Sequence, residues 1–189
     1  QNPIVDVNED VFAIADVGGN TIMIFQKSGL KGEIETTLPI EKISVSNQGI
    51  VSAILKNEST PQIISYDAVG NILVEHQVNL NSTGYPISLD MSADGENLMV
   101  SYLSTKNGTL KSMVAFYNFG KEGQEKTDNL IYTEDFDQTV VPDVFYMDAS
   151  TSVAVGDKSF VIYEGTKSVK KKTEVKLNQE IRSEFHSER

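Results

Sequence analysis

The stretch Ile63-Ile64-Ser65-Tyr66-Asp67-Ala68-Val69-Gly70 decides how the rest of the sequence is interpreted. Its β-branched residues lead to an aromatic side chain, and a polar residue and a glycine follow, which is typical of a strand that enters a tight turn. The same order recurs at Ile22–Gly29, Val114–Gly120 and Phe160–Gly165. The aromatic residues of the four copies are 41, 51 and 46 positions apart: Phe25, Tyr66, Tyr117 and Tyr163. A repeat of roughly 40–50 residues is typical of a β-propeller blade of four strands.

A second feature shows the same period. Gly49 and Gly95 each follow a short apolar run and precede another, and they are 46 residues apart. The turn Ser92-Ala93-Asp94-Gly95 has the residues expected of a tight hairpin. Two independent features with one period strengthen the prediction of a repeated blade.

The apolar residues lie in short runs rich in Val, Ile, Tyr and Phe, and no run has convincing helical periodicity. The sequence therefore predicts an all-β, β-propeller-like fold of about four blades, each with four antiparallel strands. We place the blades at about 1–38, 41–78, 85–132 and 140–177, within a single domain 1–189. Residues 180–189 resemble the start of a further blade, so we expect an incomplete arc of a larger propeller.

Composition excludes several classes of function. The chain has 189 residues, a formal net charge of −11 and no cysteine, which excludes disulfide scaffolds, thiolate metal sites and cysteine nucleophiles. The acidic balance opposes binding to nucleic acid, which requires cationic surface. No segment has the roughly 18 consecutive apolar residues that a membrane-spanning helix needs.

The turn Ser92–Gly95 and the aromatic–glycine turns resemble the YVTN/WD40-like β-propeller superfamily. More narrowly, four short motifs resemble the bacterial domain-of-unknown-function 5711 family: Val11–Asp16, Ile43–Ser46, Tyr66-Asp67 with Gly70, and Ile181–His186. This resemblance implies a parent protein with a membrane anchor near its N-terminus and a propeller-like region outside the membrane. It implies no activity and no catalytic residues.

The search for a metal site gives one segment of interest. The histidines, His76 and His186, have no partner at ligand spacing, and no calcium-loop motif is present. We expect His76 to lie on one face of an outer strand. The acidic segment Glu134, Asp135 and Asp137 is interpreted as a loop, and whether it binds calcium stays open. We predict no catalytic residue, no metal ligand and no cofactor.

Two further clusters each have a functional and a structural interpretation. Asp16, Asp67, Asp90, Asp94 and Asp148 lie near strand ends, where a pair could serve glycoside hydrolysis or could simply form turns. Lys167–Lys176 holds five basic residues. They could contact an anionic surface, or they could protect an edge strand from pairing, and we favour the second.

The leading hypothesis is a non-catalytic, extracytoplasmic binding or scaffold module whose partner is a protein or a cell-envelope polymer. The alternative is a carbohydrate-active hydrolase or lyase with carboxylates at the channel mouth. Self-association through open blade edges is a third possibility.

Overall fold

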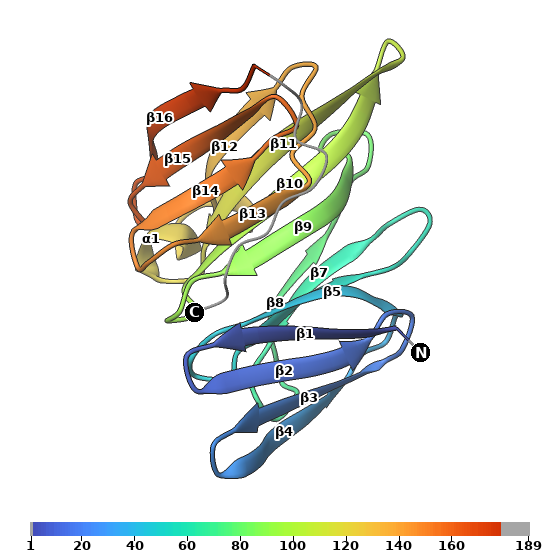
Figure 1. Cartoon of the computed structure of the whole chain (residues 1–189). Coiled ribbons are helices and arrows are strands. Elements are labelled where there is room, and N and C mark those ends of the chain that lie inside the picture. The colour runs from blue at the N-terminus through green and yellow to red at the C-terminus, as the bar shows by residue number, and fades with distance from the viewer. Residues whose placement is uncertain (1, 179–189) are drawn as a thin grey trace. The chain divides into compact units, whose positions relative to one another are not determined.

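The computed structural model describes residues 2–178, which form sixteen β-strands in four antiparallel sheets (Figure 1). Within each sheet the strands follow one another in chain order, as in a propeller blade. Blades one and two contain β1 (Pro3–Asn8), β2 (Val11–Asp16), β3 (Thr21–Gln26), β4 (Gly29–Glu35), β5 (Ile40–Val45), β6 (Val51–Leu55), β7 (Gln62–Tyr66) and β8 (Ile72–Gln77). Blades three and four contain β9 (Tyr85–Met91), β10 (Asn97–Lys106), β11 (Thr109–Asn118), β12 (Leu130–Phe136), β13 (Asp143–Tyr146), β14 (Thr151–Val155), β15 (Ser159–Glu164) and β16 (Lys170–Lys176).

The described residues divide into two compact units, and each is described by itself. Unit 1 contains residues 2–79 and 93–95 and holds blades one and two. Unit 2 contains residues 80–92 and 96–178 and holds blades three and four. Each unit is therefore a pair of neighbouring blades.

The core of unit 1 lies between its two sheets. Strands β1 and β2 pack against β5, the innermost strand of blade two. Alternation along β2 turns Val11, Ala13 and Ala15 inward, where they meet buried residues of blade two such as Ile43 and Val45. The small alanines allow the sheets to approach closely, and the β-branched residues fill the remaining volume.

The core of unit 2 is richer in aromatic rings. Phe116 of β11 makes an edge-to-face contact with Tyr163 of β15, with ring centroids 4.9 Å apart. Tyr132 of β12 contacts both of these rings edge to face. This geometry is the favourable one for aromatic pairs, and the cluster joins blade three to blade four.

The structure confirms the all-β fold, the four-bladed organisation and the turns at Gly49 and Gly95. It differs from the predicted bounds at the ends of blades one and three. Blade one, predicted to end at about residue 38, ends at Glu35 of β4. Blade three ends at Phe136, not Tyr132, because an insertion precedes β12.

This insertion contains the helical turns α1 (Lys121–Gln124) and η1 (Thr127–Asn129). Among residues 2–178 there is no helix of the length and apolar character that crossing a membrane would need. The segment 180–189, expected to begin a further blade, lies outside the described residues, and so does His186.

Candidate functional site

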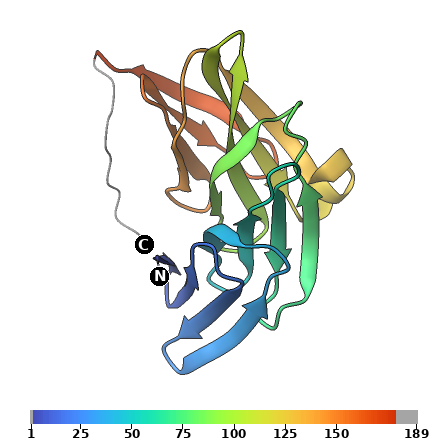
Figure 2. The ribbon, with the colours of Figure 1, turned by 90° about the vertical axis from the view of Figure 1, so that its right-hand side faces the viewer.

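The β10–β11 hairpin is the most unusual element of unit 2. Each of its strands has ten residues, whereas β14 and β15 of the neighbouring blade have five and six. Residues Asn97–Tyr102 of β10 are buried, but the strand becomes half-exposed at Leu103 and exposed from Thr105 onward. The distal half of the hairpin therefore adds nothing to the core, and its tip extends past the neighbouring strands of the unit (Figures 1 and 2).

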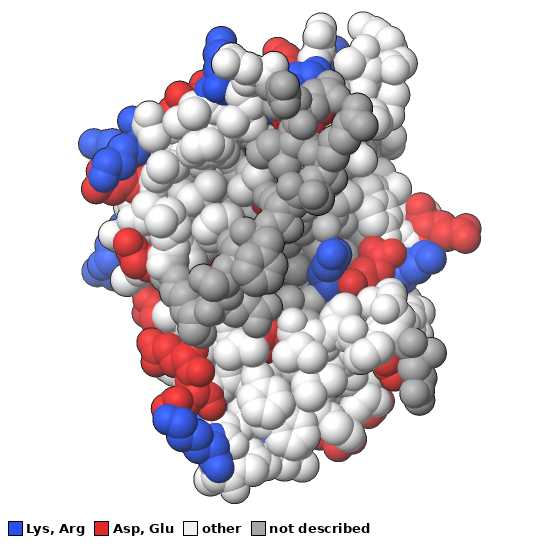
Figure 3. Space-filling model, viewed as in Figure 1, with Lys and Arg blue, Asp and Glu red and all other residues white. Residues whose placement is uncertain are grey.

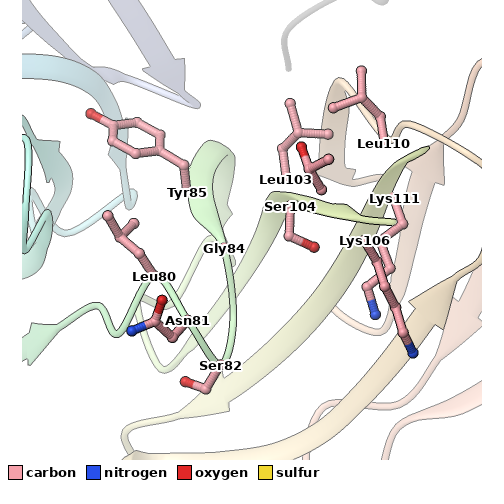
Figure 4. A pocket seen from close by; sticks show the side chains of 11 residues that line it. Leu80, Asn81, Ser82, Gly84, Tyr85, Leu103, Ser104, Lys106, Leu110 and Lys111 are labelled. Carbon is pink, nitrogen blue, oxygen red and sulfur yellow. The ribbon is translucent and has the colours of Figure 1, made fainter. Parts of the chain in front are cut away.

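A groove of about 620 Å³ lies beside this distal half, on the side of the loop that leads into β9 (Figure 4). Gly84 lets the loop approach the hairpin closely. A Cβ atom at this position would lie 2.4 Å from the carbonyl oxygen of Leu103, and the backbone φ of +91° is one that other residues rarely adopt. The lining contains apolar, hydroxyl, amide and cationic groups: Leu80, Asn81, Ser82, Gly84, Tyr85, Leu103, Ser104, Thr105, Lys106, Leu110 and Lys111.

The two faces of the distal hairpin differ in chemistry. Leu103 and Leu110 point to one side, and Ser104, Lys106 and Lys111 point to the other (Figure 4). Strand register explains this, because Ser104 pairs directly with Lys111, and Lys106 lies two residues further along the same face. The distal hairpin therefore has an apolar face and, on its opposite side, a cationic face (Figure 4).

The two lysines are without an ion-pair partner among residues 2–178, although the chain carries far more acidic than basic residues. Other lysines of unit 2, such as Lys167, Lys171 and Lys172, do pair with carboxylates. Charges are screened beyond about 8–10 Å at physiological ionic strength, so Lys106 and Lys111 act locally despite the net charge of −11. The groove can therefore receive a negatively charged group.

Hydrogen bonds fix the hairpin at the point where it leaves the blade. The hydroxyl of Ser101 donates to the carbonyl of Val141 (2.7 Å), and the N–H of Val141 donates to the hydroxyl of Ser112 (2.9 Å). All three residues are fully buried. The segment that connects blades three and four is thus bonded to both strands of the hairpin at its base, which holds the wall of the groove in place.

The acidic segment expected to be a loop is largely strand. Glu134 and Asp135 belong to β12 and point to opposite faces of the sheet, because side chains alternate along a strand. One oxygen of Glu134 accepts a hydrogen bond from the hydroxyl of Tyr163 (2.5 Å), and the other pairs with Lys171 (2.6 Å). Asp137 lies in the following turn. Glu134 is therefore a structural residue of the blade three–blade four junction, and the loop interpretation was wrong.

Burial and this hydrogen bond raise the pKa of Tyr163 well above its usual range, because both favour the neutral phenol. The same carboxylate raises the pKa of Lys171 by accepting its hydrogen bond. These shifts have structural causes. Among residues 2–178, no three or more His, Asp or Glu side chains gather closely enough to hold a metal ion.

Asp67, Asp90 and Asp148, three of the aspartates near strand ends, hold the backbone through their carboxylates. Asp67 accepts hydrogen bonds from the side chain and the N–H of Asn71, which lower its pKa. The N–H of Ser150 bonds to Asp148 and lowers its pKa in the same way. Asp90 accepts a hydrogen bond from the N–H of Tyr146 in the next blade (2.6 Å). Asp16 borders a hollow on blade one, and Asp94 lies in the hairpin turn before β10.

His76 and the lysine-rich segment lie where their structural interpretations predict. His76 is half-buried in the outer strand β8, and Lys170–Lys176 is the exposed outer strand β16, whose lysines Lys171 and Lys172 are engaged in ion pairs. Sequence reasoning missed the groove. The available signal was Asn107-Gly108, a favoured two-residue hairpin turn, which implies that the flanking strands continue through the polar residues 103–112.

Comparison with solved structures shows the fold. The chain resembles Hsv2 from Kluyveromyces marxianus with a TM-score of 0.61 and 11% identity, covering 92% of this chain and 60% of that one. It resembles hydrazine synthase from Kuenenia stuttgartiensis with a TM-score of 0.55 and 11% identity, covering 85% of this chain and 52% of that one. It also resembles acylaminoacyl peptidase from Pyrococcus horikoshii, with a TM-score of 0.56 and 13% identity, covering 89% of this chain and 31% of that one. The chain thus spans about 60% of the length of the Hsv2 structures.

At these identities the likeness concerns the fold alone, and the functions of those proteins are not transferred. No curated protein sequence matches the chain. The model of a family of unknown function, DUF5711, matches residues 1–189, which confirms the resemblance seen in the short motifs. The chain, with its four propeller blades, belongs to the DUF5711 family.

Proposed function

We propose that this chain is a non-catalytic binding module, and that the groove beside the β10–β11 hairpin receives an extended acidic segment of a protein partner. The observation that carries the proposal is the distal hairpin itself. Ten-residue strands extend past the core and carry Leu110, 50% exposed, on one face and two lysines on the other, and these lysines are without an ion-pair partner among residues 2–178.

The lining favours a peptide over a polymer of sugars or phosphodiesters. Leu80, Leu103 and Leu110 supply apolar surface that aliphatic or aromatic side chains can cover. The hydroxyl and amide groups of Asn81, Ser82 and Ser104 can bond to a peptide backbone. Lys106 and Lys111 can pair with carboxylates, so a segment that alternates acidic and apolar residues matches all three kinds of surface.

Placement outside the cytoplasm is part of the proposal, and its support is the membrane-anchored arrangement that the family resemblance implies. Protease added to intact cells that express the full-length parent protein tests it. Digestion of this segment while a cytoplasmic marker stays intact supports the placement, and digestion only after lysis contradicts it.

Selection from a random linear peptide library tests the binding itself. The wild-type chain is the only target of the selection, and the selected peptides are then measured against a Leu110→Ser variant. Leu110 is half-exposed at the hairpin tip, so its replacement leaves the core intact. We expect selected peptides to bind the wild-type chain at least about tenfold more tightly than the variant, a loss of roughly 1.4 kcal/mol for one anchoring side chain.

Leu130→Ser is the matched control, because Leu130 is also an exposed leucine of unit 2 but does not line the groove. It should bind the peptides like the wild-type chain. The proposal fails if no selected peptide distinguishes Leu110→Ser from wild type, or if the control loses binding equally. Peptides without acidic residues, or binding by anionic glycan instead of peptide, would overturn the choice of ligand.

A further inference from the structure

The tip of the β10–β11 hairpin is an Asn-Gly turn. Asn107 and Gly108 connect Lys106 to Thr109, and these two residues pair directly across the strands. The φ angles of Asn107 and Gly108 are +52° and +77°, positive at both positions as a two-residue turn of type I′ requires. Asn107 is the one asparagine of the sequence that glycine follows, so every other asparagine precedes a residue with a side chain.

The turn is exposed and makes no contact that fixes it. Residues 105–110 are all exposed, and in Figure 3 the tip is the largely white projection at the upper right. A Cβ atom at Gly108 would meet no atom within 4 Å. Among residues 2–178, neither the side-chain amide of Asn107 nor the N–H of Gly108 has a hydrogen-bond partner. The turn can therefore change its backbone angles without disturbing the core.

Other asparagines of the chain are held by their side chains. The amide of Asn20 donates to the carbonyl of Thr36 (3.0 Å), and the amide of Asn118 donates to the side chain of Asn97 (2.8 Å). A side chain bonded in this way is not free to turn toward the backbone of the residue that follows it. Asn107 has that freedom.

We propose that Asn107 is a site of spontaneous deamidation, in which its side-chain amide becomes a carboxylate by way of a cyclic imide. The backbone nitrogen of Gly108 loses its proton and attacks Cγ of Asn107. The Cγ–Nδ2 bond breaks, and the amide nitrogen takes up a proton and leaves as ammonia. Glycine favours the attack because no side chain shields its nitrogen. This inference does not depend on the binding of a peptide in the groove.

Water completes the reaction by opening the imide at one of its two C–N bonds. The product is an aspartyl residue or an isoaspartyl residue, in which the main chain continues through the former side chain. Either product places a carboxylate next to Lys106 in the sequence. The isoaspartyl form also lengthens the main chain within the turn, which then no longer fits the two-residue connection between Lys106 and Thr109.

Peptide mapping by mass spectrometry of the folded 189-residue chain, sampled over several weeks at neutral and alkaline pH, is the test. We expect position 107 to show the amide-to-acid mass change at least about tenfold faster than any other asparagine, because only there is the attacking nitrogen unshielded. The rate should rise with pH, because the deprotonated nitrogen is the nucleophile. Labelling by a protein isoaspartate methyltransferase should rise in parallel.

Asn107→Gln is the matched control. It keeps an amide and the charge of the turn, but attack on its longer side chain closes a larger ring that forms more slowly. This variant should show no conversion at position 107 and little isoaspartyl label. Asn81, which serine follows, lines the groove and is the internal control that should convert more slowly. The proposal is overturned if Asn107 stays intact in the folded chain, if another asparagine converts first, or if Asn107→Gln acquires as much label as the wild type.

Discussion

Both units join their blades through a hydrogen bond from a backbone N–H to an aspartate, but they hold the start of the second blade by different hydrogen bonds. In unit 1 the N–H of Val45 donates to Asp6 (2.6 Å), and in unit 2 the N–H of Tyr146 donates to Asp90 (2.6 Å). Each aspartate lies on an inner strand and holds the last residue of the next inner strand. A charge-assisted hydrogen bond of this kind fixes the spacing of neighbouring blades.

The entry to the second blade is held differently. In unit 1 the N–H and carbonyl of Ile40 bond to the backbone of Gly19 and Gly18, both at 2.8 Å. In unit 2 the equivalent groups of Val141 bond to the hydroxyls of Ser112 and Ser101. Both Ile40 and Val141 are fully buried, so in each case the bonds satisfy backbone groups that water cannot reach. Unit 1 therefore relies on the backbone of a turn, and unit 2 relies on two side chains.

The largest effect should follow from removing both side chains of unit 2. In the double variant Ser101→Ala/Ser112→Ala, the N–H and carbonyl of Val141 stay buried without partners. Each unpaired group costs about 1–3 kcal/mol, so we expect the free energy of unfolding to fall by about 4 kcal/mol. Urea denaturation measures this change, and a loss below about 1 kcal/mol would show that the hydroxyls do not hold the junction.

Alkaline pH should weaken unit 2 before unit 1. Burial raises the pKa of Tyr117 to about 12, and burial also raises the pKa of its hydrogen-bonded neighbour Tyr102 well above its usual value. Tyrosine in the unfolded chain titrates near pH 10, so the stability that depends on neutral Tyr117 is complete below pH 10 and is lost between pH 10 and 12. The loss from Tyr117 alone is about 2–3 kcal/mol.

Hydrogen exchange as a function of pH measures this difference by unit. Unit 1 contains one buried tyrosine, Tyr66, whose raised pKa has burial as its main cause. Tyr117→Phe should reduce the pH dependence of unit 2 between pH 10 and 12. Two results would contradict the role of Tyr117: faster exchange of unit 1 at lower pH than unit 2, or a pH dependence of unit 2 that is unchanged in Tyr117→Phe.

A smaller effect should follow from Gly18→Ala in unit 1. Gly18 has a φ of +83°, but a Cβ there would meet no atom within 4 Å. The cost is then only that of the left-handed backbone, about 1–2 kcal/mol, because the hydrogen bonds to Ile40 use backbone atoms that alanine retains. A thermal melt compared with that of the wild type measures it. A loss as large as that of the double serine variant would remove the distinction between the junctions.

The smallest effect is expected at Ser152. Its hydroxyl is buried and finds no hydrogen-bond partner among residues 2–178. Ser152→Ala removes an unpaired polar group, so the free energy of unfolding should stay the same or rise by up to about 1 kcal/mol. The variant is also the control for the serine pair, because it deletes a buried hydroxyl without releasing a backbone group. Destabilisation by more than about 1 kcal/mol would contradict this prediction, because it would show that the Ser152 hydroxyl contributes to stability.

The fold could be predicted because the third strand of each blade ends with an aromatic residue and a turn, and both are visible in the sequence. Tyr66, Tyr117 and Tyr163 are buried in the blades as that pattern requires. The groove could not be predicted in the same way. Strand residues 103–111 include lysines, hydroxyls and an Asn-Gly turn, because this part of the hairpin faces solvent and has no apolar alternation to reveal it. The role of Glu134 depends on Lys171 and Tyr163, which only the folded chain brings near it.

Amide hydrogen exchange of the chain with and without a selected acidic peptide tests the central claim, that the distal hairpin and the preceding loop form the ligand site. Our account predicts slower exchange in residues 80–85 and 103–111 when the peptide is bound, with little change at the outer strands β4 and β8. Protection should weaken as salt is raised, because Lys106 and Lys111 supply the charge. Protection confined to another surface, with residues 103–111 unchanged, would contradict it.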